Sequence, residues 1–233
     1  MRKRFGSSLT AAFALAVAFA APASAATLAN WQMNEKAGAS VMVDSSGHVN
    51  GTIGSDVVTG FTFNGATGYH WPFASPTQPP AKPGRIVQAS SSTLNPGSGA
   101  YTVQLRYRTT KHFGNIVQKG QAGSSGGYWK IENPNGNLTC VFRGTNSSGS
   151  FIRRQVVSPT VLSDGSWHTA RCARTSTALT LTIDGKVVDT AKGGTGNISN
   201  TRPLTIGGKL NCDQITTTCD YFTGDIDYVT ISN

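Results

Sequence analysis

The strongest constraint on the fold of this chain is a set of short apolar and polar alternations, joined by turns, in its C-terminal third. The segment Leu179–Ile183 alternates leucine or isoleucine with threonine, which is the period-two pattern of a strand with one buried face. Asp184-Gly185 follows at once and predicts a tight hairpin turn. This part of the chain is therefore predicted to be antiparallel β-sheet.

The same organisation extends along the rest of the chain. Strand-forming segments recur between clusters of Gly, Asn, Ser and Pro, and no stretch keeps helical periodicity over the length that a helix needs. The expected strands span residues 28–35, 57–64, 85–88, 100–108, 114–119, 127–132, 137–143, 151–157, 167–174, 178–184, 186–190, 203–207 and 221–232. That pattern predicts an all-β sandwich of two antiparallel sheets.

One connection is unusual because it concentrates proline. Residues 71–83 contain five of the ten prolines, and proline removes backbone donors and stiffens the chain. We expect an extended surface loop here, within a single domain. Aromatic residues flank it (Tyr69, His70, Trp71 and Phe73), and they either pack the loop against the sandwich edge or contact a ligand.

The N-terminal residues have the features of an export signal. A basic start at Arg2-Lys3-Arg4 precedes an alanine-rich apolar stretch, and Ala23-Ser24-Ala25 fits a small-residue cleavage site. We expect residues 1–25 to be a signal peptide and residues 26–233 to be one domain that acts outside the cytoplasm without inserting into a membrane. Removing the three leader bases lowers the net charge from +9 to +6, which favours an anionic partner.

Four cysteines in an exported chain predict two disulfides, for which three connectivities exist. The basic residues are spread along predicted strands and form no long block, so a nucleic-acid-binding arm is not expected.

Several short motifs together resemble one family. They are Trp31-x-Met33-x-Glu35, Val43-Asp-Ser-Ser-Gly47 with Asn50-Gly51, Trp167-His168, Ile183-Asp-Gly185 and Gly224-Asp-Ile-Asp227. The chain resembles the laminin-G-like, or concanavalin A-like, jelly-roll superfamily, and is similar to secreted bacterial members with cysteines flanking the Trp-His pair. The resemblance implies a jelly-roll sandwich, a fold that hosts lectins, adhesion modules, hydrolases and lyases alike.

The resemblance also implies two further features. Strands that the family places near one another carry Cys140 and Cys172, which predicts a disulfide between them. Cys212 and Cys219 flank a short polar loop and are expected to form the second disulfide. Family members often hold a structural calcium ion, for which Asp225, Asp227, Glu35 and Asp44 are the candidate ligands. The alternative for Asp44 is a turn, and for Asp227 a loop cap.

Residues 101–108 suggest a binding surface. Arg106 and Arg108 share the polar face of this expected strand, and paired guanidinium groups suit carboxylates or sulfates of acidic glycans. We expect neighbouring strands to add Gln118, Lys130, Arg143 and Arg153. The alternatives are a simple solvated strand face, or a neutral sugar stacked on Tyr69, Trp71 and Trp129.

Catalysis finds less support. A glycosidase needs two carboxyl groups at a set separation, and neither Glu35 nor Glu132 belongs to an alternating acidic strand. A lyase acting on uronic-acid polymers needs a carboxylate neutraliser with a Tyr or His acid and base, types that the chain has in Arg106, Arg108, Gln118, Tyr128 and His112. However, residues 115–118 depart from the Gln-x-His triplet of jelly-roll alginate lyases.

We therefore expect a secreted, monomeric, non-catalytic module that binds a polysaccharide or a cell-surface glycan. A polysaccharide lyase and a protein-binding adhesion domain are the alternatives.

Overall fold

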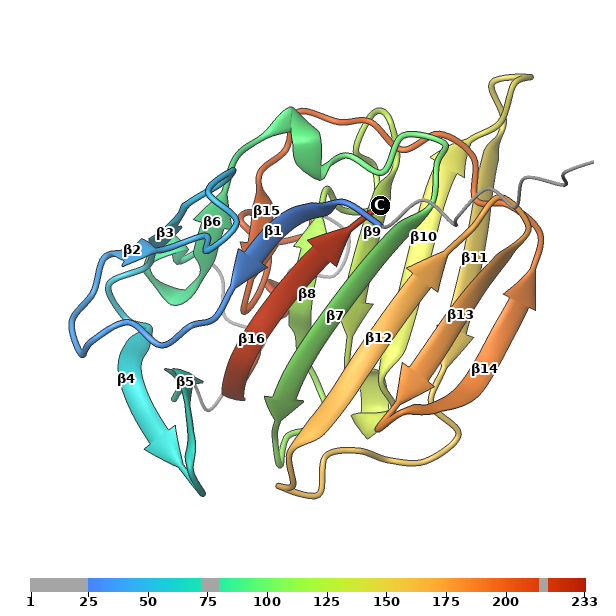
Figure 1. The fold of residues 1–233 in the computed structure, drawn as a ribbon. Helices are drawn as coiled ribbons and strands as arrows, with labels where there is room; N and C mark the ends of the chain where they lie inside the picture. Colours follow the sequence, from blue (N-terminus) through green and yellow to red (C-terminus); the bar gives the residue numbers. More distant parts are fainter. Residues whose placement is uncertain (1–24, 73–79, 214–217) are drawn as a thin grey trace, which may run out of the picture.

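The computed structural model describes residues 25–72, 80–213 and 218–233 as two antiparallel β-sheets packed face to face (Figure 1). Sheet A has the strand order β14-β13-β12-β7-β16-β5-β4, and β1 pairs with β16 beside that path. Its strands are β1 (Thr27–Trp31), β4 (Val58–Phe63), β5 (Ala66–Trp71), β7 (Tyr101–Arg108), β12 (His168–Arg174), β13 (Ala178–Ile183), β14 (Lys186–Lys192) and β16 (Gly224–Ser232). This is the predicted all-β jelly-roll sandwich.

Sheet B lies behind sheet A in Figure 1 and has the order β11-β10-β9-β8-β15-β6-β3-β2. Its strands are β2 (Val41–Met42), β3 (Gly51–Ile53), β6 (Val87–Ala89), β8 (Asn115–Lys119), β9 (Tyr128–Glu132), β10 (Thr139–Thr145), β11 (Phe151–Val157) and β15 (Leu204–Ile206). Three short 3₁₀ turns complete the described elements: η1 (Pro83–Arg85), η2 (Ser92–Leu94) and η3 (Pro134–Gly136).

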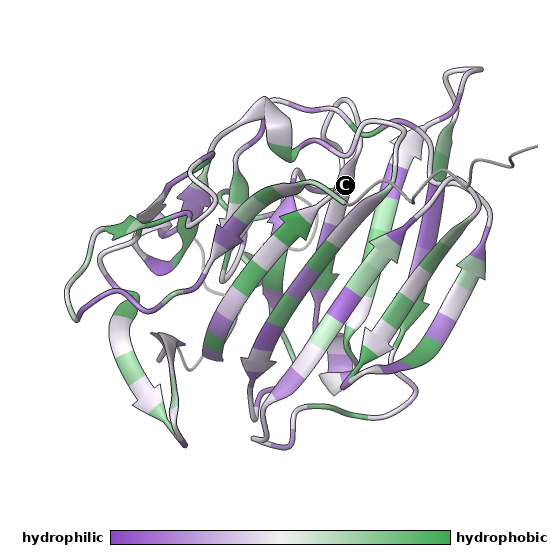
Figure 2. Cartoon of the chain, viewed as in Figure 1, coloured by the Kyte–Doolittle hydropathy of each residue, from purple (hydrophilic) through white to green (hydrophobic). Residues whose placement is uncertain are grey.

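Alternation along the strands builds the core. In β7 every second residue from Tyr101 is buried and the residues between are partly exposed. Figure 2 shows the resulting hydrophobic and hydrophilic bands across the strands of sheet A. The inward side chains of both sheets meet in one apolar layer, where the Tyr101 ring lies 5.7 Å from Trp129 and 6.2 Å from Phe142. Period-two patterning thus defines which face of each sheet is left for solvent.

Both predicted disulfides are confirmed. Cys140 on β10 is bonded to Cys172 on β12, so this bond joins sheet B to sheet A through the core, and both residues are fully buried. Cys212 is bonded to Cys219.

Turn chemistry explains one confirmed and one missed hairpin. Asp184 and Gly185 both have positive φ angles, 49° and 80°, as the predicted β13–β14 turn requires. Asn64 and Gly65 have the same pair, 49° and 80°, and connect β4 to β5. The expected strand at 57–64 is confirmed as β4, but β5 was missed, because the Asn-Gly turn returns the chain into a second strand before the proline-rich segment. The short strands β2 and β3 were also missed.

Arg174 fixes the loops at one end of the sandwich. Its side chain is 2% exposed and donates to the backbone carbonyl oxygens of Pro96, Gly97, Gly99 and Gly196. Burial lowers the pKa of Arg174 to about 10, so the guanidinium stays charged at neutral pH. A buried cation held by carbonyl dipoles therefore joins the loops at this end of the sandwich.

Two sequence predictions lie wholly or mostly outside the described residues. They are the signal peptide, of which only Ala25 is described, and the centre of the proline-rich segment with Phe73. Within the described residues, no helix is long and apolar enough to cross a membrane.

Replacing Cys140 and Cys172 together by Ala should lower the free energy of unfolding by about 3–4 kcal/mol, because the unfolded chain regains the entropy of a long loop. The Cys212–Cys219 disulfide closes a much shorter loop, so replacing both of its cysteines by Ala should cost about 2.5 kcal/mol. Urea denaturation of the two double variants measures both losses. A larger loss for the Cys212 and Cys219 pair would contradict the cross-linking role of the inter-sheet bond.

Candidate functional site

Arg106 and Arg108 share the outer face of sheet A, as predicted, but neither guanidinium is free. Arg106 Nη1 lies 2.9 Å from Asp227 Oδ2, and Arg108 Nε lies 2.6 Å from Asp225 Oδ2. Asp225 is 2% exposed and also contacts His70 Nδ1 at 2.7 Å. Each arginine therefore neutralises a carboxylate of the neighbouring strand β16, which removes the free charge that an acidic glycan would need.

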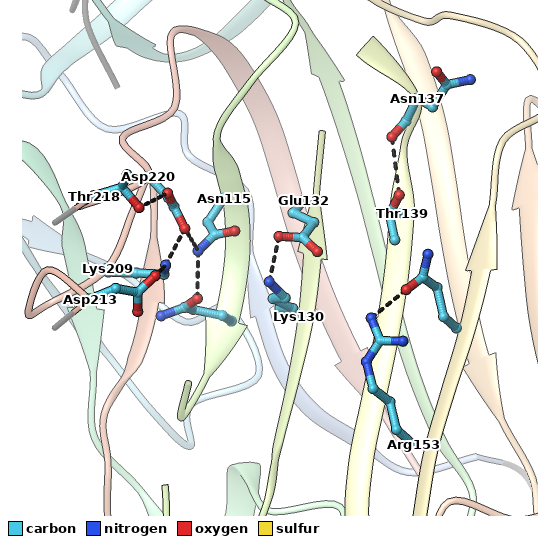
Figure 3. Close-up of polar contacts among 12 residues, drawn as sticks. Asn115, Lys130, Glu132, Asn137, Thr139, Arg153, Lys209, Asp213, Thr218 and Asp220 are labelled. Carbon is cyan, nitrogen blue, oxygen red and sulfur yellow. Dashed lines mark hydrogen bonds and ion pairs between the residues drawn. The ribbon is translucent and has the colours of Figure 1, made fainter. Parts of the chain in front are cut away.

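The other basic candidates lie on the opposite sheet. Strand β7 is flanked by β12 and β16, whereas Gln118, Lys130, Arg143 and Arg153 belong to β8, β9, β10 and β11 of sheet B. The expectation that they join Arg106 and Arg108 was wrong, because the strands that follow β7 in sequence cross into the other sheet. They share the outer face of sheet B instead, and Figure 3 shows polar side chains along that face.

The aromatic alternative is also corrected. Tyr69, Trp71 and Trp129 are fully buried at 0% exposure, and Trp129 stacks on Phe142 within the core. These rings have no free face for a sugar. Of the aromatic residues that flank the proline-rich segment, Tyr69 and Trp71 are therefore core residues.

A surface cavity of about 400 Å³ lies at one end of the outer face of sheet B. Arg143 pairs directly with Tyr128 on one side and with Arg153 on the other in the strand register. The Arg143 guanidinium lies 3.7 Å from the centre of the Phe151 ring, which is 50% exposed. The cavity is lined by these four side chains and by residues 122–125. We call it the Phe151 cavity.

Glycines bring the loop of residues 121–127 against the sheet and so shape one wall of this cavity. Gly126 and Gly127 have φ angles of 79° and 82°, and a Cβ atom on Gly127 would lie 2.2 Å from the carbonyl oxygen of Arg143. Only glycine fits both the conformation and the close approach. The Ser124 side chain then accepts a hydrogen bond from the backbone N–H of Gln121 at 2.9 Å.

A polar track continues from the cavity along the sheet. Lys130 pairs with Gln118 in the strand register, and its ammonium contacts Glu132 at 2.5 Å. Gln155 is exposed on β11. Gln118 itself is 3% exposed and accepts a hydrogen bond from the Asn115 side chain, so its amide is not free to contact a ligand fully.

The sequence contained a signal for the Phe151 cavity that was not recognised. In β11 the aromatic Phe151 occupies the same face as Arg153 and Gln155, a polar face where a large ring has no core to enter. The alternation therefore predicts an exposed Phe151 ring beside Arg153 on this strand.

The four predicted calcium ligands do not form a set that fits the ion. Asp225 and Asp227 are paired with arginines, as described above. Glu35 accepts hydrogen bonds from the backbone N–H of Val43 at 2.7 Å and from the Tyr69 hydroxyl. Asp44 accepts from four backbone N–H groups and one hydroxyl, the structure of a turn cap. Within the described residues, no three metal-ligating side chains gather into a group that suits a metal.

The residue types of the hypothetical lyase are likewise separated. Arg106 and Arg108 lie on the outer face of sheet A, whereas Gln118 and Tyr128 lie on sheet B. A neutraliser and an acid or base must contact the same sugar, so two sheets with the core between them prevent Arg106 and Arg108 from acting together with Tyr128.

Comparison with known proteins adds the family. The family model described as "Concanavalin A-like lectin/glucanases superfamily" matches residues 82–233. The chain belongs to this superfamily. A search of the curated proteins finds no match to the sequence.

Solved structures share the fold of this superfamily member. The binding domain of botulinum neurotoxin DC in complex with SialylT is 14% identical with a TM-score of 0.61, over 88% of this chain and 47% of that one. The structure titled "Cell entry of botulinum neurotoxin type C is dependent upon interaction with two ganglioside molecules" is 16% identical with a TM-score of 0.60, over 88% and 47%. This chain thus spans about half the length of these neurotoxin chains. Mouse laminin alpha1 domains LG4-5 are 25% identical over 57% of this chain and 35% of that one, with a TM-score of 0.43.

The Asp44 turn makes the free energy of unfolding depend on pH in the acidic range. Burial would raise the pKa of Asp44, but hydrogen bonds from the Ser46 hydroxyl and from backbone N–H groups outweigh burial and lower the pKa to about 2. Between this value and the unfolded pKa near 3.8, the unfolded chain binds more protons. The stabilisation from Asp44, about 2 kcal/mol, is therefore present above pH 4 and lost as pH falls through 2.

Replacing Asp44 by Asn should remove this acid-sensitive part of the stability. Urea denaturation at pH 5 and pH 2.5 should show a smaller stability loss in D44N than in the wild type. An identical loss in both proteins would mean that other carboxylates produce the acid sensitivity.

Because the four carboxylates are already engaged, we expect them to bind no calcium together. Thermal midpoints measured in chelator and in millimolar calcium should then agree, since only an ion bound to the native state raises the midpoint. A higher midpoint in calcium would contradict this expectation and support the structural ion that the family resemblance implies.

Proposed function

We propose that this protein is an exported, non-catalytic module that binds a carbohydrate at the Phe151 cavity, with preference for an acidic sugar. The observation that carries the proposal is the pairing of a half-exposed aromatic ring with two arginines in one surface cavity. A ring face packs against the apolar C–H face of a sugar, while guanidinium groups bind carboxylate or sulfate by two parallel hydrogen bonds.

The local charge supports an anionic ligand. Arg143 and Arg153 have no ion-pair partner among the described residues, in contrast to Arg106 and Arg108. Arg153 is instead bonded to the neutral Gln155 side chain, which keeps its full charge available. The whole chain is also basic, with a formal net charge of +9. Charge excess of this kind attracts anionic partners.

Two comparisons are consistent with the proposal. The printed titles of similar structures name a complex with SialylT and an interaction with gangliosides, and both concern toxin domains twice as long as the part matched here. Two disulfides suit a protein outside the cytoplasm.

Replacing Arg143 and Arg153 together by Ala should weaken binding of an acidic polysaccharide at least tenfold, because contacts to charged groups are worth roughly 1.5–3 kcal/mol each. Replacing Phe151 by Ala should weaken acidic and neutral glycans alike. Titration calorimetry against a sulfated, a uronate and a neutral polysaccharide measures these changes. Affinity for the acidic polymers should also fall as salt rises, since the guanidinium groups are solvent-accessible.

The matched control is the double variant R171A/K186A, which also removes two positive charges, but from exposed positions on sheet A. It should bind as the wild type does. Equal weakening in the control would mean that net charge alone causes the effect, and unchanged affinity in R143A/R153A would show that the ligand does not bind at this cavity.

Two other outcomes would favour the alternative functions. Unsaturated products from a uronate polymer would favour the lyase, and binding to cells without affinity for any purified glycan would favour an adhesion domain.

A further inference from the structure

Lys119, at the end of β8, is a buried ammonium group without a carboxylate partner. Its side chain is 2% exposed. The Nζ atom donates to the carbonyl oxygen of Arg202 at 2.6 Å and to that of Asn200 at 3.4 Å. An ammonium has three N–H donors, so one remains for another acceptor. Among the residues that the structure describes, no acidic side chain forms an ion pair with it.

A second buried lysine shows what an internal partner does. Lys209 is 5% exposed and contacts both Asp213 and Asp220 (Figure 3). Burial would lower the pKa of Lys209, but these two carboxylates raise it above the usual value. Lys119 has burial alone, which lowers its pKa to about 8. Its ammonium charge is thus largely retained at neutral pH and is uncompensated.

Lys119 is one of the residues that line a surface cavity of about 480 Å³, which we call the Lys119 pocket. The other lining residues carry hydroxyl or amide groups, except for a second cation, Arg202, and no acidic residue is among them: Ser90, Ser91, Ser92, Asn95, Ser199, Asn200, Thr201 and Arg202. Two cations beside neutral donors form an environment for an anion.

The wall of the pocket is ordered by its own hydrogen bonds. The Asn200 backbone N–H donates to Asn95 Oδ1 at 3.1 Å, and Asn200 Oδ1 accepts from the backbone N–H of Arg202 at 3.0 Å. The Asn200 amide also donates to the Gly127 carbonyl oxygen at 2.9 Å. These hydrogen bonds fix the loop whose carbonyl groups hold Lys119, so the pocket is preorganised for a ligand.

We propose that the Lys119 pocket is a second ligand site, distinct from the Phe151 cavity, that binds an oxyanion group such as sulfate, phosphate or carboxylate. The anion accepts a hydrogen bond from the remaining N–H of Lys119 and contacts the Arg202 guanidinium. The cavity exceeds the size of a single oxyanion, so the group can belong to a larger molecule such as an acidic sugar.

Thermal melting with sodium sulfate, sodium phosphate or sodium glucuronate, each against sodium chloride at equal ionic strength, tests the proposal. At least one anion should raise the wild-type midpoint above chloride, by roughly 5–10 °C when its concentration is 100 times Kd. The anion with the largest effect identifies the oxyanion class. Sulfate and phosphate also stabilise proteins by exclusion from their surface. Only a difference between variants in the rise of the midpoint is therefore evidence of binding at this pocket.

The variant K119M should lose this excess, whereas K186M, which removes an exposed lysine on β14, should keep it. Calorimetry should show an affinity for the same anion at least several-fold weaker in R202Q, a surface change that preserves folding even if K119M does not fold. No excess in the wild type, an equal excess in K119M, or unchanged affinity in R202Q would overturn the proposal.

The two sites are separable in the same assays. K119M should bind glycans at the Phe151 cavity as the wild type does, and R143A/R153A should keep the anion-induced rise. Failure of one proposal therefore leaves the other measurable.

Discussion

The apolar layer between sheets A and B is the interaction on which the rest of the structure depends. Each strand contributes alternate side chains to it, and rings such as Tyr101, Trp129 and Phe142 pack there edge to face or stacked. Because neighbouring residues of a strand point to opposite faces, the register that buries Trp129 and Phe142 places Tyr128 and Arg143 outside. The residues of the Phe151 cavity are thus the outward-facing neighbours of core residues on the same strands. The Cys140–Cys172 bond joins the two sheets across that core.

The acidic residues decide which cations remain available to a ligand. Asp225 and Asp227 occupy the two arginines of β7, and Asp213 and Asp220 occupy Lys209. Arg174 is satisfied by carbonyl groups at the end of the sandwich. What remains without a carboxylate, among the described residues, includes Arg143 and Arg153 on the outer face of sheet B and Lys119 beside it. With few acids in the chain, the pairing of each carboxylate decides which of these cations keep an unneutralised charge.

Several parts of the fold were predictable because they depend on local chemistry. Alternation over residues 178–183 and the Asp184-Gly185 turn predicted the β13–β14 hairpin. The family resemblance predicted the Cys140–Cys172 disulfide, and the short loop between Cys212 and Cys219 predicted the other. The Asn64-Gly65 turn carried equally local information but was read as the end of a strand, so β5 was missed. The strands β2 and β3 are too short for alternation to reveal them, since two or three residues do not define a period.

The candidate site was only partly predictable. Arg143, Lys130, Gln118 and Arg153 were assigned to a common binding surface from the sequence, and they do share the outer face of sheet B. The sequence could not show that Arg106 and Arg108 belong to the other sheet, because sheet membership follows from crossovers between strands distant along the chain. Nor could it show that β16 would place two carboxylates beside them. Alternation determines which residues share a strand face, whereas the pairing of distant strands determines which charges meet, and only tertiary structure decides the latter.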